Sequence, residues 1–260
     1  MISRRVVLSV SLCAGLAGGC SSSALPAATT TPSVTTTALA SPSAQASPLL
    51  VSQPTASTGS SLQSIPASDT DLEPGTYAFH FPLMDQPGRP FPRVLITLPA
   101  GWSSFHGFGV RSLGDTPREL FVGFWNVTGV YSHPCQSKGP MLDPGPTVDG
   151  LADTLAKIPL RNATAPVDVT LDEYRGRYLE WSVPRDADFS TCDTLDFESW
   201  TAYGTGGTDR YQQAPGQTDR LWILDVESRR LVIDAAFLPA TTAEDRANTQ
   251  KIVESIAFER

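Results

Sequence analysis

The residues of this chain best suited to chemistry are the carboxylates of one acidic segment, PRDADFSTCDTLDFESW, at residues 184–200. Paired carboxylates serve as acid and base in hydrolases, and clusters of oxygen ligands bind calcium. The calcium-loop pattern fails here, because Ser190 and Thr191 stand where it has an acidic residue and a glycine. The segment therefore reads as a solvated loop, with a hydrolytic carboxylate pair as the alternative. Its acidic residues are Asp186, Asp188, Asp193, Asp196 and Glu198.

Motifs of the common catalytic classes are missing from the sequence. It contains no Gly-x-Ser-x-Gly, no His-Glu-x-x-His, no phosphate-binding loop and no Ser-x-x-Lys. The three histidines, His80, His106 and His133, are a small supply for general acid–base catalysis. We therefore expect no catalytic site, no metal and no cofactor, and a binding function is favoured.

A glycine-rich segment, ESWTAYGTGGTDRYQQAPGQ at residues 198–217, offers the first candidate contact for a ligand. Aromatic side chains on such a loop can stack on a sugar or a peptide. The alternative is a surface loop whose rings cover the edge of the core. The candidate ligand-binding residues are Trp200, Tyr203 and Tyr211.

The first 19 residues are organised as a signal peptide, with a basic start, an apolar core from Val6 to Leu16 and small residues before Cys20. The apolar run is shorter than the roughly 20 residues that span a bilayer. The stretch LAGGC resembles the bacterial lipobox, with Ala17 where that family prefers Leu. This resemblance implies cleavage before Cys20 and a lipid on its thiol. The protein would then be anchored at the extracytoplasmic face of the cell membrane, and ordinary secretion is the alternative.

Composition divides the rest of the chain into a linker at residues 20–70 and one globular domain at residues 71–260. The linker is rich in Ser, Thr, Ala and Pro and has no charged residue before Asp69, so we expect it to be disordered. Of the 19 basic residues, two lie in the signal peptide, and the other 17 stand against 27 acidic ones. This balance, about −10, disfavours nucleic-acid binding.

Hydrophobic patterning in the domain predicts strands and helices in the order β-β-β-α-β-β-β-β-α. Two hairpins are expected, 75–81 with 93–98 and 219–226 with 230–237, and the apolar segment 120–127 is expected to be a central strand. One helix should start after Thr147, and another after Thr242, which forms a capping box with Asp245. We therefore predict an α+β fold, a mainly antiparallel sheet with two packed helices.

Several short stretches resemble a group of uncharacterised secreted lipoproteins of actinobacteria over most of residues 74–258. They are PGTYAF, VLITLPAGW, GPTVDGLADTLAKIP, VTLDEYRGRYLEWSVP, RLWILDVESRRLVIDAAF and IVESIAF. The element order distantly resembles the Mog1/PsbP-like α/β/α sandwich of LpqN-type lipoproteins. That resemblance implies binding of partners without a shared catalytic site, and it assigns no functional residue.

Two of the four cysteines are not expected to form disulfides. Cys13 lies in the signal peptide, and Cys20 would carry the lipid. Cys135 and Cys192 remain, in loop-like segments of a protein exported to an oxidising compartment, and we expect them to form a disulfide. The alternative is a metal site that includes His133, which would need further ligands at close spacing.

Together these features predict a lipid-anchored, non-catalytic domain of the cell envelope that binds a protein or an envelope glycan. The alternatives are a hydrolase of envelope polymers that uses the acidic residues and an extracytoplasmic ligand sensor.

The lipid on Cys20 can be tested by metabolic labelling with palmitate. The wild-type protein should incorporate the label and Cys20→Ser should not, because the substitution removes the thiol that accepts the lipid. Equal absence of label from both proteins would show plain secretion.

Overall fold

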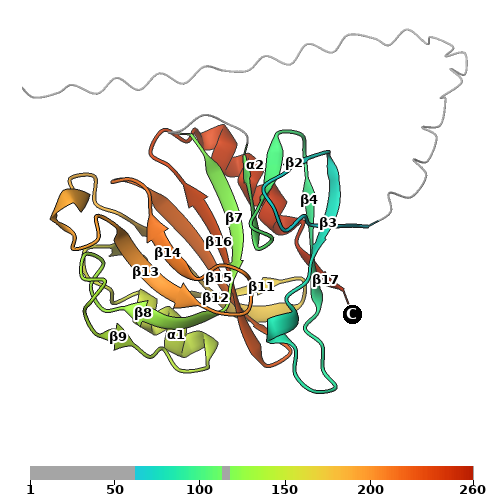
Figure 1. The fold of residues 1–260 in the computed structure, drawn as a ribbon, viewed down its shortest axis with the longest axis horizontal. Helices are drawn as coiled ribbons and strands as arrows, with labels where there is room; N and C mark the ends of the chain where they lie inside the picture. Colours follow the sequence, from blue (N-terminus) through green and yellow to red (C-terminus); the bar gives the residue numbers. More distant parts are fainter. Residues whose placement is uncertain (1–61, 113–117, 260) are drawn as a thin grey trace, which may run out of the picture. The chain divides into compact units, whose positions relative to one another are not determined.

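The computed structural model describes residues 62–112 and 118–259, which form a mainly antiparallel β structure with two α-helices (Figure 1). The predicted signal peptide, Cys20 and the linker up to residue 61 lie outside the described residues. Pairing within the domain begins before residue 71, because Gln63 and Ser64 align with Tyr77 and Ala78. Among the described residues, no helix is long and apolar enough to cross a membrane.

Three sheets make up the described part of the chain, and all their strand pairs are antiparallel except β1 with β3. The nine-stranded sheet contains β2 (Asp71–Leu72), β5 (Trp102–Phe105), β6 (Gly109–Ser112), β7 (Leu120–Trp125), β16 (Arg229–Phe237), β15 (Thr218–Val226), β12 (Tyr174–Ser182), β11 (Val167–Leu171) and β10 (Asn162–Ala163). A second sheet contains β1 (Gln63–Ser64), β3 (Gly75–Phe79), β4 (Arg93–Leu98) and β17 (Ala257–Glu259). The third contains β14 (Asp209–Gln212), β13 (Phe197–Ala202), β8 (Val127–Tyr131) and β9 (Met141–Leu142).

Both α-helices start at the predicted caps and pack on strands. The helix α1 (Val148–Leu155) follows Thr147, whose hydroxyl accepts a hydrogen bond from the Gly150 amide at 3.0 Å, and it contacts β12 and β15. The helix α2 (Ala243–Glu254) has the capping box of Thr242 and Asp245, and it contacts β4, β7 and β16. Two short 3₁₀ helices complete the structure, η1 (Pro82–Met84) and η2 (Phe189–Thr191).

The longest hairpin, β15 with β16, turns through two residues in the left-handed backbone region. Glu227 and Ser228 have φ angles of 54° and 63°, the conformation of the two-residue turns whose twist matches that of antiparallel strands. Both predicted hairpins are confirmed, since β3 also pairs with β4. The predicted central strand is confirmed as β7, which lies between β16 and β6.

Aromatic contacts show what covers each face of the nine-stranded sheet. On one face, Phe124 of β7 packs against Phe79 of the second sheet, with ring centroids 4.7 Å apart. On the other face, Trp125 packs against Trp200 of the third sheet, with ring centroids 5.9 Å apart. The structure confirms the mainly antiparallel α+β fold. It does not confirm the Mog1/PsbP-like sandwich, because strands as well as helices cover the sheet.

The predicted disulfide between Cys135 and Cys192 is present and joins the loop after β8 to the loop after η2. The Asp193 carboxylate strengthens this junction by accepting hydrogen bonds from the backbone amides of Ser137 at 3.0 Å and Lys138 at 3.3 Å. No group of side chains in the described residues has the arrangement of a metal site.

Removing this disulfide should destabilise the domain. The two cysteines are 57 residues apart, and closing a loop of that length stabilises a fold by about 4 kcal/mol in the chain-entropy model. Urea unfolding of the double variant Cys135→Ser, Cys192→Ser should show a loss of about 2–4 kcal/mol, and reduced wild-type protein should match it. Unfolding midpoints equal to that of the oxidised wild type would contradict the expectation.

Candidate functional site

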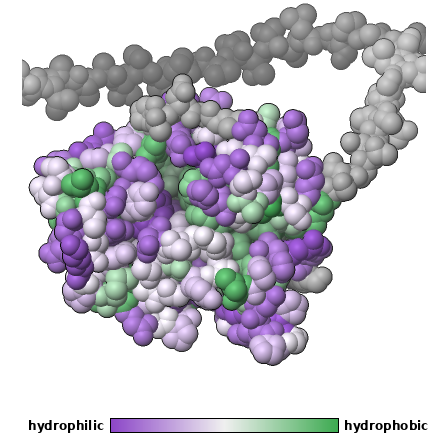
Figure 2. All heavy atoms as spheres, in the orientation of Figure 1, coloured by the Kyte–Doolittle hydropathy of each residue, from purple (hydrophilic) through white to green (hydrophobic). Residues whose placement is uncertain are grey.

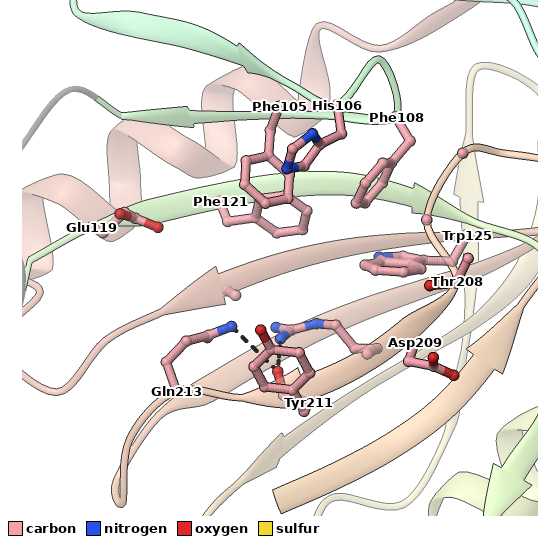
Figure 3. A pocket seen from close by; sticks show the side chains of 14 residues that line it. Phe105, His106, Phe108, Glu119, Phe121, Trp125, Thr208, Asp209, Tyr211 and Gln213 are labelled. Carbon is pink, nitrogen blue, oxygen red and sulfur yellow. Dashed lines mark hydrogen bonds between the residues drawn. The ribbon is translucent and has the colours of Figure 1, made fainter. Parts of the chain in front are cut away.

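A pocket of about 300 Å³ opens between the nine-stranded sheet and the hairpin of β13 and β14 (Figure 3). Aromatic side chains from both sides line it. Besides His106, four belong to the β5–β7 region of the nine-stranded sheet and one to β14: Phe105, Phe108, Phe121, Trp125 and Tyr211. We call the first four the aromatic layer.

Two glycines on neighbouring strands make room for this layer. Gly109 of β6 and Gly123 of β7 are paired in register. A Cβ atom would lie 2.8 Å from the Phe121 ring at Gly109 and 2.2 Å from it at Gly123. The ring of Phe121 therefore lies directly over bare backbone, a known way of compensating for glycine in a sheet.

Glycines in the β13–β14 turn let the hairpin close onto the same rings. Gly206 has a φ of 103°, which side-chain-bearing residues rarely adopt. A Cβ atom at Gly207 would lie 2.5 Å from the Trp125 ring and 3.0 Å from Phe108. The glycine-rich sequence thus serves close packing between the hairpin and the aromatic layer.

The rings of the layer pack edge to face, which fixes their orientation. Phe108 lies 4.8 Å from Trp125 and 5.5 Å from Phe105, both as centroid distances. Phe108 and Trp125 are buried, whereas Phe105 and Phe121 are half-buried. Tyr211, with 44% of its surface exposed, faces them across the pocket. Ring surface from both walls is therefore open to a ligand.

A buried ion cluster lies beside the pocket, between the nine-stranded sheet and the third sheet. Arg210 of β14 donates from Nε to Asp234 at 2.6 Å and from Nη2 to Asp219 at 2.7 Å. Both carboxylates are fully buried, and Gln217 donates a further hydrogen bond to Asp219 at 2.9 Å. Burial raises the pKa of the Asp234 carboxyl to about 7, against the opposing attraction of Arg210.

The cluster continues to a second arginine through Gln212. Its amide donates to Asp219 at 3.1 Å, while its carbonyl accepts from Arg161 at 2.6 Å. The Arg161 guanidinium also stacks on Trp181, 4.1 Å from the ring centroid. Burial lowers the pKa of Arg161 to about 9. Gln212 thus connects a second buried guanidinium to the ion pairs between the nine-stranded sheet and the third sheet.

The structure brings one of the three aromatic candidates to the pocket. Tyr211 lines it, whereas Tyr203 is 61% exposed and lies outside its lining. The expectation for Trp200 requires correction, because Trp200 lies in strand β13 and has no exposed surface. Its ring packs against Trp125 and Trp181, so it supports the pocket wall from behind.

None of the five residues of the acidic segment lines the aromatic pocket. Asp188 caps η2, and Asp193 holds the loop beside the disulfide. Burial, followed by the charges of Asp196 and Asp209, raises the pKa of Glu198 to about 7. The roles of Asp188 and Asp193 are structural, and the segment places no carboxylate pair in the pocket.

Sequence reasoning missed the aromatic layer and the ion cluster. Phe121 and Trp125 were expected only as residues of a central strand, and Arg210 only as part of a loop. The available signal was Gly123, which interrupts the apolar strand LFVGFW, since such glycines mark close approach of another group.

Arg210→Met should lower the free energy of unfolding by about 3–5 kcal/mol, because it leaves two buried carboxylates without their cation. Adding Asp219→Asn and Asp234→Asn should recover part of this loss. Urea unfolding measures the stability of the single variant and of the triple variant. Arg89→Met is the control, since Arg89 is exposed and its Nη2 lies 3.5 Å from the Glu227 carboxylate. Equal stabilities of the two single variants would show that the cluster is not a major source of stability.

Neither a protein-family model nor a curated protein sequence matches this chain. The resemblance to secreted actinobacterial lipoproteins stays a prediction from short motifs. Any assignment of function therefore rests on the geometry of the pocket.

Proposed function

We propose that this protein is a non-catalytic binding protein of the cell envelope, tethered to the outer face of the membrane by a lipid on Cys20, and that an envelope glycan binds in the aromatic pocket. The observation that carries this proposal is the set of aromatic rings on two facing walls, with polar side chains between them. The tether rests on the lipobox resemblance alone.

A sugar ring suits this combination of groups. Its C–H faces pack on aromatic rings such as Phe121 and Tyr211, and its hydroxyl groups take hydrogen bonds from polar side chains such as Gln213 and Thr208, which also line the pocket. A volume of about 300 Å³ lies at the small end of the range for ligand sites. We therefore expect one sugar unit of a longer chain to enter.

The surface drawn in Figure 2 favours a local site over a broad protein interface. The face of the domain seen in Figure 2 is mostly hydrophilic, with hydrophobic residues in small groups. Extended protein interfaces depend on a larger desolvated centre. A protein partner is thus the weaker form of the proposal.

Burial of the ion cluster removes Asp219 and Asp234 from the carboxylates that the hydrolase alternative could use. Glycoside hydrolysis needs two carboxyl groups that reach the scissile bond from opposite sides. Asp219 and Asp234 both bind Arg210, but neither has exposed surface with which to meet a substrate.

The proposal predicts that Tyr211→Ala weakens binding of full-length protein to purified cell-wall polysaccharide about tenfold, because it removes one aromatic wall. Tyr203→Ala is the matched control, a more exposed tyrosine of the same hairpin that does not line the pocket. Co-sedimentation with the polysaccharide measures both. Equal binding by the two variants would place the site elsewhere, and retention of a protein but no polysaccharide would favour the protein-binding form.

A further inference from the structure

The charge of the pocket narrows the class of ligand. Arg210 lines it, but all three of its guanidinium nitrogens already donate to groups of this chain. Nε and Nη2 bind Asp234 and Asp219, and Nη1 donates to the Tyr211 carbonyl. Because two carboxylates share this guanidinium, the cluster of Arg210, Asp219 and Asp234 has no surplus positive charge to offer an anionic ligand.

Two further carboxylates line the pocket and have no partner of opposite charge among the described residues. Glu119, just before β7, and Asp209, at the start of β14, lie at different ends of it (Figure 3). Within residues 62–112 and 118–259, neither side chain makes a hydrogen bond or an ion pair. The lining of the pocket therefore includes an acidic residue at each end.

The aromatic layer already attracts cations from within the chain. The Arg111 guanidinium carbon lies 5.3 Å from the Phe105 ring centroid, and that of Arg210 lies 5.8 Å from Phe121. Arg111 is itself neutralised by Asp69 at 3.1 Å. Aromatic faces and nearby carboxylates both favour a positively charged group, and combining them is how proteins bind organic ammonium ions.

From this geometry we infer that the group entering the pocket is an organic ammonium, a protonated or quaternary amine carried by the bound glycan. This inference rests on the proposed glycan site and names the class of sugar substituent that it selects. Sugars with carboxylate or phosphate groups are disfavoured, because they would face Glu119 and Asp209. Among the described residues that line the pocket, the two basic side chains already have carboxylate partners, Arg210 with Asp219 and Asp234, and His106 with Asp69 at 3.7 Å.

The test compares choline with dimethylbutanol, its uncharged carbon isostere, by isothermal titration calorimetry on the full-length protein. The two probes have the same shape, so a difference in affinity reports the charge. We expect choline to bind at least fivefold more tightly than the alcohol. Glu119→Gln and Asp209→Asn should each weaken choline binding about threefold and leave the alcohol unaffected. Asp153→Asn, which neutralises an exposed carboxylate on α1, is the control and should change neither affinity.

Equal affinities for choline and the alcohol would overturn the inference, as would choline binding that is insensitive to both pocket substitutions. The test also distinguishes failure of this inference from failure of the proposed function. If Tyr211→Ala reduces polysaccharide binding but choline shows no preference, the glycan site stands without the ammonium. If choline is preferred but wild-type protein does not bind polysaccharide, the pocket binds an ammonium compound that is not part of a glycan.

Discussion

The ion pairs of Arg210 with Asp219 and Asp234 are the constraint around which the two sheets are arranged. Arg210 belongs to a four-residue strand of the third sheet, whereas both aspartates belong to the long hairpin of the nine-stranded sheet. Charges taken out of water are tolerated only with close, well-directed partners, so the cluster permits very little sliding of one sheet over the other. The aromatic pocket lies beside this junction, and its width is set by the same contacts.

Local signals in the sequence predicted much of the frame. Alternating apolar residues identified the hairpin of β15 and β16, and hydroxyl residues at Thr147 and Thr242 identified the start of both helices. These features depend on neighbours in the chain, which is why patterning detects them. The disulfide followed from the number of cysteines that remained once Cys13 and Cys20 were assigned.

The pocket could not be predicted in the same way, because its parts meet only through tertiary contacts. A glycine-rich, polar segment predicts a loop, yet residues 197–202 and 209–212 form strands and bury Trp200. Aspartates such as Asp219 look solvated in a strand pattern until the partner arginine is known. The aromatic layer likewise depends on Gly109 and Gly123, whose function is visible only once the two strands are aligned.

A single residue links the strand that carries Phe121 and Trp125 to the third sheet, whose strand β14 lines the other side of the pocket. Strand β7, which carries Phe121 and Trp125, ends one residue before β8, and the intervening Asn126 accepts a hydrogen bond from the Tyr203 amide at 2.9 Å. Strand β8 in turn pairs with β13, so the hairpin opposite the aromatic layer is fixed to β7 through Asn126 and this strand pairing. The site is thereby preorganised: the proposed ligand would enter a slot whose walls are already in place, and little conformational entropy would be lost on association. For a ligand held by a few weak stacking contacts, this saving would contribute much of the affinity.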